Sequence, residues 1–107
     1  MAVSVVTVAE LRRGAIAARW SDRRAEALNE QVRKYVVLPV DSAVAEEWAR
    51  MRVRCDELGR RKSDNDLWVA ATASRFGLTL ATLDRDHEDI PGLRVIGEDG
   101  IEVTVPE

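Results

Sequence analysis

The chain has 107 residues, of which 46% are hydrophobic and 33% are charged, and its formal net charge is −3. A chain of this length and balance is expected to fold as one globular domain, residues 1–107, and neither disorder nor a membrane span fits its composition. The negative charge excludes a global positive field that would gather nucleic acid. Because Cys55 is the only cysteine, no intrachain disulfide can form, and we expect a cytoplasmic protein with Cys55 in its core.

The order of predicted elements is typical of an α/β fold. In chain order we expect helices that begin at Thr7 and Ser21, a strand at 35–40, a long helix capped by Asp41 or Ser42, a helix capped by Ser63, and strands at 78–83, 93–96 and 101–105. Gly59 and Gly77 stand where the last two helices should end. Helices that alternate with short apolar strands favour a parallel sheet covered on both faces.

The helix after Ser63 carries a run of small residues, Ala70, Ala71, Thr72 and Ala73. Small side chains let a helix backbone approach a sheet closely, and close packing would hold the first turn of this helix firmly. Firm placement matters for a carboxylate in that turn, because a ligand-binding side chain must keep its geometry within a fraction of an ångström or so.

Three acidic residues are candidates for a site. Glu10 follows Thr7 by three positions and Asp66 follows Ser63 by three, so each also fits a capping box, in which it would only stabilise a helix start. Asp84 ends the apolar run 78–83 and could equally begin a turn. If the carboxylates converge, they would need a hard cation such as Mg²⁺ or Mn²⁺, and the lack of a Cys/His set disfavours zinc.

Two other features have an ordinary interpretation and a functional one. The only histidine, His87, lies in a polar turn just past Asp84, and we expect it at the surface rather than in a metal site. The basic runs Arg12–Arg13 and Arg60–Lys62 are expected to be solvated faces, and the alternative is that they steer phosphate groups toward the acidic residues.

The segments Thr7–Leu11, Asp66–Ala73 and Leu80–Asp86, in this order, resemble the PIN-domain ribonucleases, and among them the VapC-type toxins of toxin–antitoxin pairs. Pro91–Val95 extends the likeness. The resemblance implies a three-layer α/β fold with a parallel sheet between helices, a Mg²⁺ or Mn²⁺ site, an RNA substrate and a cognate VapB-type antitoxin. It also implies that Glu10, Asp66 and Asp84 are catalytic, metal-binding acids, with Asp86 as an auxiliary metal ligand.

The chain departs from the family pattern at its start. Family members begin with a central strand that ends in Asp, whereas no acid precedes Glu10 here. Relative to the family we therefore expect the first strand and its Asp to be missing, with weak Mn²⁺ binding and poor RNA cleavage as the result. The helix at residues 7–18 has an apolar stripe, and Trp20 lies in the short connection to the next helix. Because a small monomer rarely exposes so much apolar surface, these features also predict a homodimer or an antitoxin complex.

Three functions are consistent with these observations. The first is a metal-dependent endoribonuclease toxin that hydrolyses RNA phosphodiesters with its acidic residues. The second is a non-catalytic PIN-like module, or an inactive truncated toxin, that binds an antitoxin or itself. The third is a purely structural α/β domain, in which Glu10 and Asp66 are helix caps and nothing more.

Overall fold

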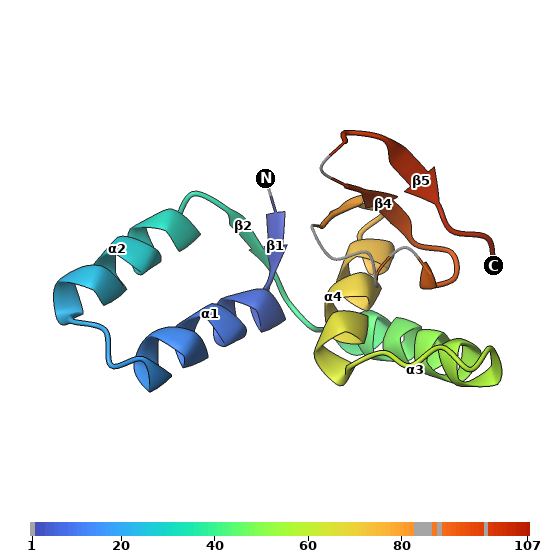
Figure 1. Cartoon of the computed structure of the whole chain (residues 1–107), viewed down its shortest axis with the longest axis horizontal. Helices are drawn as coiled ribbons and strands as arrows, with labels where there is room; N and C mark the ends of the chain where they lie inside the picture. The colour runs from blue at the N-terminus through green and yellow to red at the C-terminus, as the bar shows by residue number, and fades with distance from the viewer. Residues whose placement is uncertain (1, 83–86, 88, 98) are drawn as a thin grey trace. The chain divides into compact units, whose positions relative to one another are not determined.

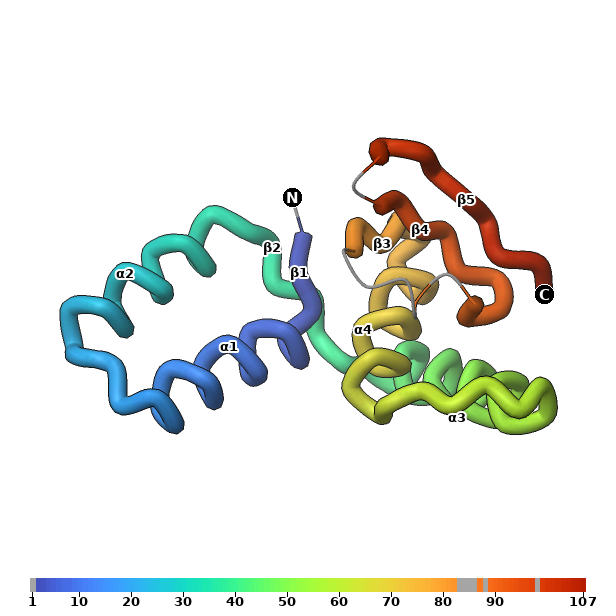
Figure 2. The backbone as a smooth tube through the Cα atoms, viewed as in Figure 1, coloured from blue at the N-terminus to red at the C-terminus, as the bar shows by residue number. Residues whose placement is uncertain are grey.

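The computed structural model describes residues 2–82, 87, 89–97 and 99–107, and the chain divides into two compact units, residues 1–39 and 40–107 (Figure 1, Figure 2). Each unit contains helices and a small sheet of its own. In the described part of the chain, none of the helices combines the length and the apolar character needed to cross a membrane.

The unit formed by residues 1–39 is a pair of helices beside a pair of strands. Its elements are β1 (Ala2–Ser4), α1 (Val5–Ala17), α2 (Asp22–Val32) and β2 (Val36–Leu38). The two strands are parallel, with Val3 opposite Val37. Between the helices the chain reverses (Figure 2), and Arg19 there has a φ of 54°, a left-handed conformation that ends α1 sharply.

The start of α1 differs from the prediction. Ser4 caps this helix, because its Oγ accepts a hydrogen bond from the backbone N–H of Val6 at 3.1 Å, and Thr7 lies inside the helix. Both hydroxyls could cap a helix, but pairing with β2 extends to Ser4 and fixes where the extended backbone ends. Glu10 is therefore in the second turn, and its interpretation as part of a capping box is wrong.

The unit formed by residues 40–107 packs two helices against a three-stranded sheet. Its elements are α3 (Ser42–Glu57), α4 (Asp64–Arg75), β3 (Leu80–Ala81), β4 (Arg94–Ile96) and β5 (Glu102–Thr104). The order is β3-β4-β5, with β3 parallel to β4. β5 runs antiparallel to β4, unlike the parallel sheet that we predicted, since the short connection between them leaves no room for a crossover helix.

The ends of α3 and α4 follow the sequence signals. Asp41 rather than Ser42 caps α3, because its Oδ1 accepts from the N–H of Val44 at 2.8 Å. Gly59 and Gly77 follow the two helices with φ values of 67° and 66°, a left-handed conformation that glycine adopts without steric cost. The capping predictions for these helices are confirmed.

The core of this unit lies between α3, α4 and the sheet. It buries apolar residues from both helices and from β4, together with two residues that precede β4 and one that follows β5. The buried residues are Val44, Met51, Cys55, Leu67, Ala70, Ala71, Ala73, Ile90, Leu93, Val95 and Val105. Cys55 is thus a core residue, as predicted, and burial raises the pKa of its thiol above the ordinary value near 9.0.

The two helices also meet through a pair of aromatic rings. Trp48 of α3 and Trp68 of α4 stack with their ring centroids 4.8 Å apart and their planes at 15°. The indole N–H of Trp48 reaches the backbone oxygen of Asp64 at 3.4 Å, so that α3 contacts the very first residue of α4. The small residues Ala70 and Ala71 are fully buried in the core, and α4 packs closely against α3, while its predicted close approach to the sheet stays a prediction. Together these contacts hold the first turn of α4 in place.

Candidate functional site

Asp66 stands in the first turn of α4, the position that the sequence singled out. The Oγ of Ser63 accepts a hydrogen bond from the backbone N–H of Asp66 at 3.1 Å, which confirms the predicted cap. The side chain of Asp66 is 35% exposed, and its Oδ1 lies 3.7 Å from Nε2 of His87. The carboxylate is therefore held at a defined place and is still accessible to a ligand.

His87 is not the surface residue that we expected. It is only 7% exposed, and its Nδ1 lies 3.2 Å from the hydroxyl oxygen of Thr82 at the end of β3. Ile90 and Leu93, three and six residues further on, are fully buried and draw the turn into the core. The spacing 87, 90, 93 was the signal in the sequence that could have predicted an inward-facing histidine.

The basic run that precedes α4 also differs from both of its interpretations. Arg61 is exposed, but the Nζ of Lys62 lies 2.5 Å from Oδ1 of Asp89 and its side chain is only 5% exposed. Arg60 donates to the backbone oxygen of Asp89 at 2.6 Å. Arg60 and Lys62 thus bind a segment of the protein itself and are not a solvated face that steers phosphate. Arg12 and Arg13 on α1 are exposed, as expected for a solvated helix face.

The structure does not place the other predicted acids beside Asp66. Glu10 is an exposed residue of α1, in the unit formed by residues 1–39, so its convergence with Asp66 stays a prediction. Asp84 and Asp86 lie outside the described residues. Within the residues that are described, no group of three or more His, Cys, Asp and Glu side chains is arranged to hold a metal ion.

The chemistry of the described donors fits a hard divalent cation. Asp66 offers carboxylate oxygens, the ligands that Mg²⁺ and Mn²⁺ prefer. The only cysteine is buried in the core, at a raised thiol pKa, and cannot contribute the thiolate that a soft metal would select.

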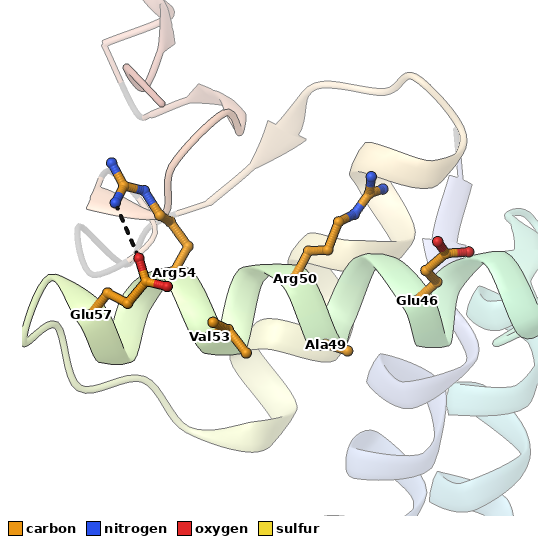
Figure 3. A pocket seen from close by; sticks show the side chains of 6 residues that line it. All are labelled: Glu46, Ala49, Arg50, Val53, Arg54 and Glu57. Atoms are coloured by element: carbon orange, nitrogen blue, oxygen red, sulfur yellow. Dashed lines mark hydrogen bonds and ion pairs between the residues drawn. The ribbon is translucent and has the colours of Figure 1, made fainter.

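A second surface feature of this unit is a shallow groove along the outer side of α3 (Figure 3). Its walls are side chains spaced one helical turn apart, and the Arg54 guanidinium lies 3.5 Å from the Glu57 carboxylate at one end of it. The lining residues are Glu46, Ala49, Arg50, Val53, Arg54 and Glu57. Two arginines lie between a glutamate at each end of the groove, so its carboxylates do not converge on one point (Figure 3).

Comparison with known proteins decides the family. A family model described as "PIN domain" matches residues 1–93. The chain belongs to the PIN-domain family. The predicted resemblance and the predicted α/β fold class are confirmed, and the matched region of this PIN domain extends across both compact units and includes Glu10, Asp66 and Asp84.

Several relatives of this PIN domain have names that describe an activity. Ribonuclease VapC5 of Mycobacterium tuberculosis (strain ATCC 25618 / H37Rv) is 45% identical over 94 residues, which cover 86% of this chain and 70% of the relative. Ribonuclease VapC4 of the same organism is 35% identical over 96 residues, which cover 88% of this chain and 74% of the relative.

Solved structures share the fold. VapBC-5 from Mycobacterium tuberculosis, a member of the VapBC family of toxin-antitoxin systems, matches with a TM-score of 0.79 at 42% identity, over 90% of this chain and 80% of that chain. DNA-bound VapBC from Salmonella typhimurium matches with a TM-score of 0.82 at 27% identity, over 91% and 74% of the two chains.

Proposed function

We propose that this PIN-domain protein is a VapC-type toxin, an endoribonuclease that cleaves RNA and is held in check by a VapB-type antitoxin. The observation that carries the proposal is the accessible carboxylate of Asp66, fixed in the first turn of α4 inside a region that is 45% identical to a ribonuclease. We infer that residues 1–107 act as one domain, because the family match spans both units. We propose that it acts on its RNA substrate in the cytoplasm.

We propose that Glu10, Asp66 and Asp84 hold a divalent cation, Mg²⁺ or Mn²⁺, with Asp86 as an auxiliary ligand. The cation would supply positive charge beside the phosphodiester, where negative charge develops during hydrolysis. The carboxylate oxygens of Asp66 are held in place because Asp66 belongs to α4, whose inner face is buried in the core. His87 faces that carboxylate through Nε2, and Thr82 contacts the other ring nitrogen of the histidine, Nδ1. The contribution of the protein is mainly to place charge and substrate.

We further propose that an antitoxin or a second copy of the chain covers the apolar surface of the unit formed by residues 1–39. Side chains of β1, α1 and α2 line an apolar groove in this unit, among them Val8, Leu11 and Leu28. Leu11 is partly exposed, as are Val36 and Val37 of β2. An antitoxin partner is consistent with the solved VapBC relatives, which belong to toxin-antitoxin systems.

The test compares two neighbouring acids of α4. Asp66→Asn should abolish Mn²⁺-dependent cleavage of a labelled RNA, because the amide removes a charged oxygen ligand. Asp64→Asn is the matched control: Asp64 is in the same turn, and an asparagine oxygen there can still accept the hydrogen bond that the Arg52 guanidinium donates to Oδ1 at 2.5 Å, so we expect cleavage to survive. Removal of the metal with EDTA should stop cleavage by the unmodified chain.

Metal binding can be read separately from activity. His87 is the only histidine, so its ring protons give isolated NMR signals, and bound paramagnetic Mn²⁺ should broaden them in the unmodified chain and in Asp64→Asn. Asp66→Asn should weaken the broadening. Cleavage that survives Asp66→Asn, or Mn²⁺ that never broadens the His87 signals, would contradict the proposed site and favour a non-catalytic interaction module.

A further inference from the structure

A buried ion pair joins the loop before α4 to the turn that carries His87. The Lys62 ammonium lies 2.5 Å from the Asp89 carboxylate, and the side chain of Lys62 is almost completely shielded from water, whereas that of Asp89 is half exposed. Arg60 reaches the same residue through its backbone oxygen, at 2.6 Å. Two basic side chains from one loop therefore converge on a single residue 27 positions from the lysine.

The same loop is also attached to α3. Arg52 donates one hydrogen bond to the backbone oxygen of Lys62 at 3.0 Å, and its other terminal nitrogen lies 2.5 Å from the Asp64 carboxylate. The loop is thus held from two directions, by Arg52 of α3 on one side and by Asp89 on the other. Its last residue, Ser63, caps α4, so that the position of the loop determines where α4 begins.

These contacts connect to one another through Asp66. Lys62 is four residues before Asp66 along the chain, and Asp89 is two residues after His87. Between these segments, Nε2 of His87 faces Oδ1 of Asp66 at 3.7 Å. Burial of an ammonium group costs free energy, so a buried ion pair is weak evidence that the pair stabilises the fold. The pair between Lys62 and Asp89 is better explained by the relative position of the two segments that it joins.

We propose that Lys62 and Asp89 are positioning residues that set the place of the Asp66 carboxylate against His87. The inference rests on the proposed function insofar as Asp66 is the acid that the reaction needs. Neither residue has to touch the substrate. Their ion pair fixes the start of α4 relative to the His87 turn, and a small displacement of an acid in a site of this kind costs about a hundredfold in rate.

The experiment uses the single histidine as a probe of that contact, at a fixed pH and without metal. In the otherwise unmodified chain, Asp66→Asn should shift the His87 ring signals, because the two side chains are neighbours. In a Lys62→Met background the same Asp66→Asn change should lose most of its effect. Lys62→Met keeps most of the buried aliphatic length, and the near-ultraviolet signal of the Trp48–Trp68 stack should confirm that α3 and α4 remain packed.

Two further variants sharpen the result. Arg61→Met removes a charge from the same loop at an exposed position and should leave the His87 response as it is. Lys62→Arg should restore part of the response that Lys62→Met removes. RNA cleavage by Lys62→Met should fall by about a hundredfold in kcat with little change in KM, as expected for misplacement of a reacting group.

The outcomes separate this inference from the proposed function. An undiminished His87 response to Asp66→Asn in the Lys62→Met background would overturn the positioning role, whatever the activity. Equal losses in Arg61→Met and Lys62→Met would also overturn it, because they would reflect the charge of the loop and not the ion pair. Absent metal binding or cleavage in the unmodified chain would contradict the proposed function, while the metal-free His87 signals would still decide whether Lys62 and Asp89 place Asp66.

Discussion

The two compact units differ in how much core each builds for itself. Residues 40–107 bury apolar side chains from α3, α4 and the sheet around the fully buried Leu67. In the described part of residues 1–39, the buried side chains are Ser4, Val8 and Ala15 alone, and Ile16 on α1 is 78% exposed. A periodic apolar stripe therefore shows that a helix has a face to cover, but it does not show that its own chain covers it.

The largest effect that can test this contrast is the removal of a leucine from each unit. Leu67→Ala should lower the free energy of unfolding by about 2–5 kcal/mol, because it removes a fully buried side chain and leaves a cavity. Leu11→Ala should cost less than about 1 kcal/mol, because Leu11 is already 46% exposed and loses little apolar burial. Urea unfolding followed by circular dichroism measures both values.

The same two variants, Leu67→Ala and Leu11→Ala, can also contradict the difference in core between the two units. A loss at Leu11 as large as that at Leu67 would mean that α1 is covered in solution, by a partner or by a second copy. The loss at Leu11 would then depend on protein concentration, because association stabilises the folded state by mass action. Repeating the titration at a tenfold dilution separates a covered helix from an unexpectedly well-packed one.

A smaller effect comes from the helix caps. Asp41→Ala should destabilise the protein by about 1 kcal/mol, since Oδ1 of Asp41 accepts a hydrogen bond from the Val44 N–H at 2.8 Å at the start of a helix that supports the core. Ser21→Ala, which removes an exposed and longer contact of 3.3 Å to the Arg24 N–H, should cost less. Equal shifts in the urea midpoint for the two variants would contradict the difference between the units.

The smallest effect under ordinary conditions concerns pH. Burial raises the pKa of Cys55 in the folded chain, so at alkaline pH the unfolded chain loses its thiol proton before the folded chain does. The contribution of Cys55 to stability is therefore complete below pH 9.0 and declines as the pH rises above that value. Cys55→Ala should flatten this decline. The free energy of unfolding, measured between pH 7 and pH 10 for both chains, tests this. The same slope with pH in both chains would contradict a contribution from the thiol.

Much of the unit formed by residues 40–107 could be predicted from the sequence because its signals are local. A serine three residues before Asp66 and a glycine after each long helix predicted the position of α4 and its cap. Local signals failed at Ser4 and Thr7, two hydroxyls that can both cap a helix. Pairing between strands made that choice, and strand pairing joins residues far apart in the chain.

The neighbours of Asp66 were harder to predict than Asp66 itself. In the sequence, Lys62 is one of three adjacent basic residues that are expected to be solvated, and only the fold shows its contact with Asp89. His87 lies in a polar stretch, and only the burial of Ile90 and Leu93 shows that it faces inward. A buried charge is specified by its partner, and no short window of the sequence contains both members of this pair. The convergence of Glu10 and Asp84 with Asp66 stays a prediction, because Glu10 belongs to the other compact unit and Asp84 lies outside the described residues.

The burial of the only thiol has a practical consequence for spectroscopy of this chain. Cys55 is enclosed in the core, so it should react slowly with maleimide dyes and nitroxide reagents while the protein is folded. A cysteine introduced at the exposed Arg61 would then take up a single label without any need to remove the native one. A spin label there would report directly how tightly the loop before α4 is held, and how that changes when the neighbouring lysine loses its charge.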